Sequence, residues 1–254
     1  MFAEQRQAQI LQLLDARGSI TLTELVTLLQ ASESTIRRDL QDLDKKKKLV
    51  RVFGGAMSVD SRTSLHEERV ADREAVNIEE KNRIARYAAS LIMPDDFIYI
   101  DAGTTTAAMI PFITEHSAVY VTNAVAHGLE LARRGFRVNL IGGEIRTPTE
   151  AIVGSAACEE LRSYNFTKCF MGTNGADPDS GFTTPDIGEA VIKGRAMAQS
   201  RQRYILCTAE KFQIVSPVHF ADFADATVIT DHCPDSWYEQ QRNVVVAPDL
   251  PDPA

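Results

Sequence analysis

The stretch SESTIRRDL, residues 32–40, decides the fold of the N-terminal region. Ser32 is a favourable N-cap, because a serine hydroxyl accepts hydrogen bonds from the free backbone N–H groups of a first helical turn. In a helix that starts here, Ile36, Leu40 and Leu43 lie within about 60° of one another and form one apolar stripe. We therefore expect a short helix that packs through this stripe and leaves its other face outside.

That outer face is rich in hydrogen-bond donors. Ser34, Arg38 and Gln41 fall opposite the apolar stripe, and Arg37 lies at its flank. Arginine suits such a face because its planar guanidinium can bind guanine O6 and N7, or a phosphate, in a bidentate manner.

The flanking sequence completes a small module. EQRQAQILQLLDA (4–16) and TLTELVTLLQ (21–30) have helical periodicity, whereas KKKK (45–48) leads into LVRVFGGA (49–56), which alternates like a strand and ends on a glycine pair. Three short helices followed by a basic hairpin are the layout of a winged helix-turn-helix, whose third helix enters the major groove. The alternative is a generic three-helix module in which the lysine run is only solvated.

The charge distribution supports the first interpretation. The chain has 254 residues and a formal net charge of -8. Residues 1–56 nevertheless hold nine Lys/Arg against seven Asp/Glu, whereas the rest holds 18 against 28. A basic patch on an otherwise acidic body indicates one polyanion-binding surface.

Other features of the sequence argue against several classes of protein. No apolar run approaches the roughly 18 residues that a membrane span needs, and no export signal is visible, so we expect a cytoplasmic protein without a membrane partner. The cysteines at 158, 169, 207 and 233 lack CxxC spacing, and the five histidines show no HExxH. We expect reduced thiols, no structural metal and no cofactor.

The N-terminal residues resemble the helix-turn-helix signature of the DeoR-type family of bacterial transcriptional regulators. The resemblance covers Arg6, Ile10 and Leu14, the stretch 32–40, and RVFGGA (51–56) at the end of the wing. It implies binding to double-stranded operator DNA through the third helix. Asp39 is expected to be structural and to orient a neighbouring arginine, because a carboxylate facing phosphates would be repelled. The candidate DNA-binding residues are Ser32, Ser34, Thr35, Arg37, Arg38, Gln41, Lys48 and Arg51.

The rest of the chain predicts an α/β fold. Residues 57–76 are polar with little periodicity and are typical of a linker, which gives three parts: a winged helix-turn-helix (1–56), a linker (57–76) and an α/β domain (77–254). From there β-rich runs such as FIYIDAG, AVYVTNA and RYILCTA alternate with helical ones. This pattern predicts a mostly parallel sheet with helices on both faces, and such sheets bind ligands at the carboxyl ends of their strands.

Several of those strand ends carry glycine or small polar residues. DAGTTT (101–106) ends a strand and opens a helix, where Gly103 allows close approach and the threonines add hydroxyls to free amides. An ordinary helix cap has the same composition. Further polar ends at 122–123, 142–143 and 172–177 favour a shared anion site instead.

The same segments resemble the effector domain of DeoR-type regulators, which is similar to the fold of sugar-phosphate isomerases. The resemblance implies that a phosphorylated sugar is held by Asp101, Gly103, Thr104, Thr105, Thr106, Thr122, Asn123 and Lys211, with Gly142 and Gly143 at a neighbouring strand end and Asn174, Glu189 and Lys193 as less secure candidates. Glu189 and Lys193 are four residues apart, so a simple surface pair is an equal alternative. Thr208 stands where many members have an Asp, which affects ligand preference. The phrasing of GTNGAD and GFTTPD is closest to regulators of phosphotransferase-imported sugars, so fructose 1-phosphate or tagatose 6-phosphate is the expected effector class.

These observations favour a repressor that binds operator DNA as a dimer or tetramer and responds to a sugar phosphate. One alternative is an isomerase-like enzyme that carries a DNA-binding module, with Asp177, Asp186, Glu189 and Lys193 as acid and base. A nonspecific nucleoid protein is disfavoured, because the net charge of -8 repels DNA outside the basic patch.

Overall fold

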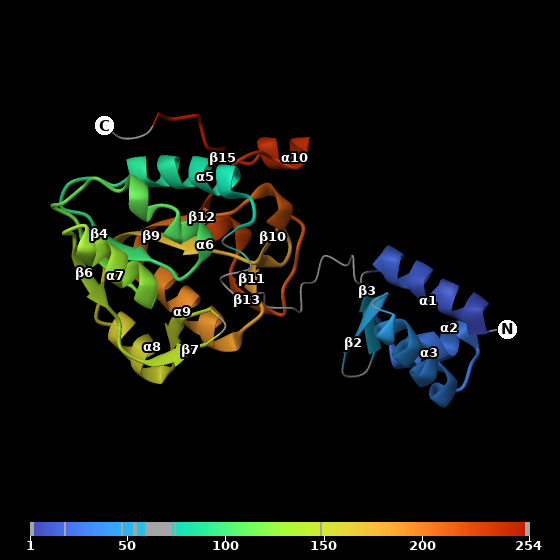
Figure 1. Ribbon diagram of the computed structural model, residues 1–254. Helices are drawn as coiled ribbons and strands as arrows, with labels where there is room; N and C mark the ends of the chain where they lie inside the picture. The colour runs from blue at the N-terminus through green and yellow to red at the C-terminus, as the bar shows by residue number, and fades with distance from the viewer. Residues whose placement is uncertain are drawn as a thin grey trace. The chain divides into compact units, whose positions relative to one another are not determined.

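The computed structural model describes residues 3–17, 19–46, 48–52, 55–58, 73, 75–147 and 149–251. The chain divides into two compact units, residues 1–63 and 64–254, which are drawn in Figure 1. Most of the expected linker at 57–76 lies outside the described residues, so the boundaries at 56 and 76 stay predictions. No helix in the described ranges is long and apolar enough to cross a bilayer.

The first unit has the expected winged helix-turn-helix layout. Its elements are α1 (Ala3–Arg17), β1 (Ser19–Thr21), α2 (Leu22–Leu29), α3 (Glu33–Lys45), β2 (Leu49–Val52) and β3 (Gly55–Ser58). Ser32 is the N-cap of α3, and its Oγ accepts from the backbone N–H of Thr35 at 3.3 Å. Ile36, Leu40 and Leu43 are buried in one small core with Ile10 of α1.

The short strand β1, which the sequence did not predict, completes the sheet of the wing. β3 pairs antiparallel with both β2 and β1, so the sheet order is β1-β3-β2. The three residues of β1 are too few for any period-2 pattern to be recognised. Pairing of Ile20 with Ala56 places both side chains in the core.

The second unit is built on a seven-stranded sheet in the order β15-β14-β12-β9-β4-β5-β6, and all six pairings are parallel. The strands are β4 (Phe97–Ile100), β5 (Val119–Thr122), β6 (Arg137–Leu140), β9 (Phe166–Gly172), β12 (Ser200–Leu206), β14 (Thr227–Thr230) and β15 (Val244–Val246). The expected mostly parallel α/β fold is therefore confirmed.

Helices cover both faces of this sheet, as Figure 1 shows. One face packs on α5 (Ile78–Ser90), α6 (Thr104–Ala107), the 3-10 turn η1 (Ile110–Phe112) and α7 (Val125–Arg133), and the other on α8 (Ser155–Leu161) and α9 (Ile187–Ala198). Alternation along β4 serves both cores, because Ile98 and Ile100 lie on the α5 side and Tyr99 on the α9 side. All residues of β4 after Phe97 are thus buried, which explains the continuous apolar run of this strand.

Smaller elements add to this frame, and the sequence did not predict their antiparallel pairing. They are the hairpin β7 (Glu144–Arg146) and β8 (Ala151–Val153), the sheet of β10 (Gly175–Asp177), β11 (Gly181–Thr184) and β13 (Val218–Ala221), the 3-10 turns η2 (Ala209–Lys211) and η3 (Phe223–Asp225), and α10 (Ser236–Glu239). All four cysteines are free, and Cys169 and Cys207 are buried.

Candidate DNA interface and effector site

The outer face of α3 presents a continuous row of polar side chains. Ser34, Arg38 and Gln41 are exposed as predicted, and Lys45 extends the row by one further turn. The sequence interpretation did not include Lys45 among the candidates. Within the described part of the chain, Arg38, Gln41 and Lys45 make no hydrogen bond or ion pair, so their donors are available to a ligand.

The flank of the helix is more constrained. Arg37 donates through Nε to Oε1 of Glu33 at 2.8 Å, and its Nη2 lies 2.6 Å from the same oxygen. Both side chains are well exposed, so water screens this pair. Thr35 shares a 2.7 Å hydroxyl contact with Ser32, which is occupied in capping.

The two wing candidates are placed less completely. Lys48 is exposed just before β2. Arg51 lies within β2, and its side chain is outside the described residues.

Asp39 has the structural role that was expected, and its partner is an arginine in another helix. Its buried carboxylate accepts from Nε of Arg6 in α1, with a second contact from Arg6 Nη2 at 3.2 Å. Gln7 adds a contact at 3.4 Å. The arginine oriented by Asp39 is therefore not one of those on the DNA-facing side.

In the second unit, the carboxyl ends of β4 and β9 meet at a buried ion pair. Lys193 of α9 donates to Oδ2 of Asp101 and, at 3.1 Å, to the carbonyl of Gly172. The N–H of Gly172 also donates to Asp101, at 3.0 Å. Burial raises the pKa of Asp101, and the Lys193 ammonium opposes that effect. Two residues predicted to bind the effector therefore hold each other in place.

Other predicted residues brace the same strand ends. Asn123 accepts from the N–H of Ala102 at 2.9 Å and donates to the carbonyl of Ile152 at 3.3 Å. Thr106 donates to the carbonyls of Asp101 and Gly103. These side chains fix the shape of the loop after β4.

The remaining candidate threonines lie at the end of β5 and in α6, and they differ in their hydrogen-bond partners. Thr122 accepts from the N–H of Ala124 at 3.1 Å, whereas the buried Oγ1 of Thr105 has no hydrogen-bond partner in the described part of the protein. Thr104 is 8% exposed. Thr105 therefore carries a buried hydroxyl whose hydrogen bond is not satisfied within the described residues.

Glu189 and Lys193 do not form the surface pair that their spacing permits; that alternative is wrong. Both side chains are buried, and each contacts a different partner. Glu189 accepts from Thr149 and lies 3.5 Å from Nη1 of Arg146, whose Nε is 3.2 Å from Asp186. Burial on α9 separates the two side chains, a fact that spacing alone does not contain. Arg146 and Thr149 were missed because one ends a short hairpin strand and the other lies in the turn after it.

The other strand-end candidates lie in loops. Asn174 accepts from Thr184 at 3.2 Å, and the N–H of Gly142 donates to Glu160 at 2.8 Å. Gly143 has φ 153°, and a Cβ there would lie 2.6 Å from the carbonyl oxygen of Val153. Gly143 is thus required by the hairpin itself.

Lys211 follows the end of β12, and its surroundings differ from those of Lys193. It is half-buried in η2, and its ammonium makes no hydrogen bond or ion pair within the described residues. Thr208, which caps η2, is buried and contacts Oε1 of Glu210 at 3.3 Å. Thr208 thus places a neutral hydroxyl three residues before a lysine that has no hydrogen bond or ion pair in the described part of the chain.

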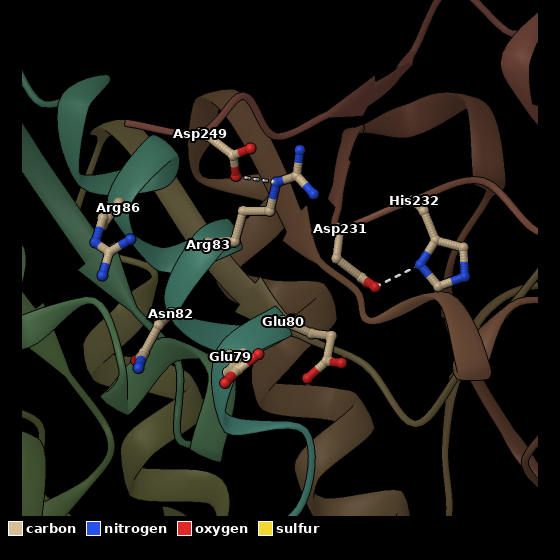
Figure 2. A pocket seen from close by; sticks show the side chains of 8 residues that line it. All are labelled: Glu79, Glu80, Asn82, Arg83, Arg86, Asp231, His232 and Asp249. Atoms are coloured by element: carbon tan, nitrogen blue, oxygen red, sulfur yellow. Dashed lines mark hydrogen bonds and ion pairs between the residues drawn. The ribbon is translucent and has the colours of Figure 1, made fainter. Parts of the chain in front are cut away.

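A separate hollow of 460 Å³ contains none of the predicted effector residues. Figure 2 shows its lining, which comes from α5, the end of β14 and the C-terminal segment: Glu79, Glu80, Asn82, Arg83, Arg86, Asp231, His232 and Asp249. Arg83 pairs with Asp249 at 3.0 Å, and Asp231 contacts Nδ1 of His232 at 2.6 Å. Four carboxylates in this lining disfavour a phosphate ligand.

The chain matches two family models and many relatives. The DeoR-like helix-turn-helix domain matches residues 6–62, and the DeoR C terminal sensor domain matches residues 76–232. An uncharacterized HTH-type transcriptional regulator of Bacillus subtilis, FruR, is 39% identical over 96% of this chain and 98% of that protein. The lactose phosphotransferase system repressor of Streptococcus mutans is 30% identical over 92% and 94%.

A solved structure of ribose 5-phosphate isomerase from Methanocaldococcus jannaschii aligns with 54% of this chain and 55% of its own at 12% identity, with a TM-score of 0.40. That score is too low to bear on function. The two family models and the full-length relatives, together with the winged module and the parallel sheet, show that this chain belongs to the DeoR family of transcriptional regulators.

Proposed function

We propose that the protein is a repressor of a sugar-metabolism operon whose affinity for operator DNA is controlled by a phosphorylated sugar. The observation that carries the proposal is the row of Arg38, Gln41 and Lys45 on α3, whose donors are unpaired in the described part of the chain. An exposed, donor-rich face on the third helix of a winged helix-turn-helix is suited to the edges of bases in a major groove.

The second unit supports a binding role for the effector. Lys211 is a half-buried cation without a counter-ion, near the strand ends where parallel sheets bind ligands. One relative is named as a lactose phosphotransferase system repressor, which supports a sugar-related effector. Fructose 1-phosphate or tagatose 6-phosphate is the effector class that we infer.

The assembly and location follow from the DNA-binding role. Two winged modules on a palindromic operator require at least a dimer, and a tetramer is the other form that we infer. Operator binding places the protein in the cytoplasm.

The contacts of the four acid and base candidates favour a regulator over an enzyme. Asp177 accepts backbone N–H groups of its own turn, Asp186 caps α9 and pairs with Arg146, and Glu189 and Lys193 have the partners described above. A general base needs access to a substrate proton, and these groups are engaged in structural contacts.

The test is a titration of labelled DNA from the protein's own promoter region by fluorescence anisotropy at fixed salt. Sugar phosphates and their unphosphorylated sugars are added in parallel. We expect tight binding to one sequence, and a change of about tenfold or more in affinity with one phosphorylated sugar, which corresponds to a coupling of about 1.4 kcal/mol. Equal affinity for DNA of every sequence would contradict the proposal.

Two variants test the effector response, and an activity assay tests the enzyme alternative. Lys211→Ala should bind DNA normally without effector but respond weakly to it, whereas the exposed Arg133→Ala should behave as the unaltered protein. Incubation with ketose phosphates, followed by NMR, should show no interconversion. Measurable turnover would favour the isomerase-like alternative.

A further inference from the structure

The outer side of α9 carries apolar side chains that the rest of the described chain leaves uncovered. Four residues of this helix lie within about 60° of one another around its axis: Ile187, Val191, Gly194 and Ala198. Ile187 is 70% exposed and Val191 is 49% exposed, whereas Ala196 on the opposite side is buried in the core. Exposed apolar side chains that gather on one surface are typical of a site of protein association.

This side of α9 lies in a groove of 400 Å³. The walls of the groove come from Cys158 of α8 and from β13, and α8 and α9 cover the same face of the sheet (Figure 1). A Cβ on Gly194 would lie 3.2 Å from the carbonyl oxygen of Phe220, so a glycine suits the close approach of β13. Because Gly194 and Ala198 are small, a second helix can also approach α9 closely beyond Val191. The groove is therefore suited to a helix as its occupant.

The groove differs in charge from the domain that carries it. The chain after residue 56 holds 18 Lys/Arg against 28 Asp/Glu. Among the described residues that line the groove there is no carboxylate and one permanent cation, Arg195. The Nε of Arg195 is buried, and its guanidinium makes no hydrogen bond or ion pair with the described residues. Two copies of this acidic domain therefore repel each other least where their grooves meet.

The two ends of α9 are complementary under a two-fold axis. Such an axis across the groove places two copies of the helix antiparallel, so that the start of each lies beside the end of the other. The carboxylate of Asp186 caps the start of α9, whereas Arg195 stands in its last turn. Antiparallel packing thus brings unlike charges together and opposes the two helix dipoles favourably.

We infer that the groove along α9 binds the same groove of a second copy of this chain, with the two α9 helices antiparallel. Each copy then covers Ile187 and Val191 of the other. The inference rests on the proposed function for the need of a dimer, because two winged modules bind a palindromic operator. The exposed stripe and the charge of the groove support it independently. The inner side of α9 carries Glu189 and Lys193, so the interface lies directly behind two predicted effector residues.

The experiment is sedimentation velocity ultracentrifugation of the full chain without DNA, at several protein concentrations and under reducing conditions. The variants are Val191→Glu, Ile187→Glu and Ile187→Ser. The control is Leu129→Glu, because Leu129 of α7 is 53% exposed and lies outside the groove. Circular dichroism and thermal unfolding establish that each variant is folded. If Val191→Glu is unfolded, the two variants of the more exposed Ile187 decide the question.

We expect the unaltered protein to associate, and Val191→Glu and Ile187→Glu to raise the dissociation constant about tenfold or more, because each places unpaired carboxylates in the interface. Ile187→Ser should lie between, since it removes apolar area without adding a charge. The control should stay within about twofold of the unaltered protein. If the unaltered protein is a tetramer, Val191→Glu should leave a dimer, because a tetramer with two kinds of interface loses only one of them.

Equal association of Val191→Glu and the unaltered protein would overturn the inference and place the interface elsewhere. An unaltered protein that stays monomeric at every concentration would also overturn it, and so would a loss of association in Leu129→Glu as large as in Val191→Glu. In each of these cases the anisotropy titration still judges the proposed function. A monomeric Val191→Glu that binds the operator as tightly as the unaltered protein would support the interface and contradict operator binding as a dimer.

Discussion

The carboxylate of Asp39 in α3 is held by the guanidinium of Arg6 in α1, 33 residues earlier in the chain. The side chains of Arg6 and Asp39 are only 11% and 5% exposed, so the pair is largely withdrawn from water. It joins the first helix to the buried side of α3, the helix that we expect to contact DNA. The position of the outward row on α3 therefore depends on a contact made at the opposite face.

Replacing Arg6 with Gln should destabilise the first unit by about 3 kcal/mol, because it leaves a buried carboxylate without its counter-ion. Urea unfolding of the full chain, followed by circular dichroism, measures the change. Arg37→Gln is the matched control, since it breaks only the exposed pair with Glu33 and should cost less than about 0.5 kcal/mol. Similar losses in the two variants would show that Asp39 does not need Arg6.

Replacing Arg38 with Ala should leave stability unchanged and weaken operator binding by about 1 to 3 kcal/mol, with relaxed preference at one base pair. Anisotropy titrations on the operator and on single-base variants, at several salt concentrations, provide the measurement. If all sequences lose affinity equally and the salt dependence becomes shallower, Arg38 contacts a phosphate and reads no base.

Replacing Lys193 with Met should destabilise the second unit by about 3 to 5 kcal/mol, because it leaves the Asp101 carboxylate buried without a cation. The double variant Asp101→Asn, Lys193→Met should recover more than half of this loss, since it removes the charge as well. Chemical unfolding of the two single variants and the double variant forms a double-mutant cycle. Additive losses would contradict a coupled pair.

The buried imidazole of His127 should make stability depend on pH. Burial lowers its pKa to about 4, although the nearby backbone of Gly103 opposes the shift. The unfolded chain therefore takes up this proton first as the pH falls below about 6.5, and stability is lost between about pH 6.5 and pH 4.

Between pH 7 and pH 5 the loss from this group alone should be about 2 kcal/mol. Urea unfolding at pH 7 and pH 5 measures this loss. Over that interval the free energy of unfolding of His127→Gln should fall by about 2 kcal/mol less than that of the unaltered protein. An unchanged pH dependence in His127→Gln would contradict the expected protonation.

Replacing Gly143 with Ala should cost about 2 kcal/mol or more, because φ is 153° and the added Cβ meets the Val153 carbonyl oxygen at 2.6 Å. Gly103→Ala is the contrast: φ there is 176°, and the nearest atom to a Cβ is Thr106 Oγ1 at 3.3 Å. In thermal unfolding, the Tm of Gly143→Ala should lie well below the Tm of Gly103→Ala. The opposite order would show that the hairpin relaxes around the new methyl group.

Much of the DNA-binding unit could be predicted from the sequence, because local rules determine it. The cap at Ser32, the apolar stripe from Ile36 to Leu43 and the exposed row that includes Arg38 all follow from helical geometry. The partner of Asp39 did not follow, since pairing with Arg6 depends on how two helices pack.

The effector unit was less predictable in its details. Alternating runs predicted the parallel sheet, but the role of Glu189 and Lys193 depended on which residues the fold buries around α9. Spacing cannot distinguish a surface pair from two buried groups with separate partners.

The unpaired row on α3 has a consequence for how such regulators diversify. Because Arg38, Gln41 and Lys45 are exposed and make no hydrogen bond or ion pair with the rest of the described chain, they can be exchanged without weakening the core behind them. A duplicated gene could therefore acquire a new DNA target through a few substitutions, while the inherited scaffold and its metabolite-sensing half remain as they were.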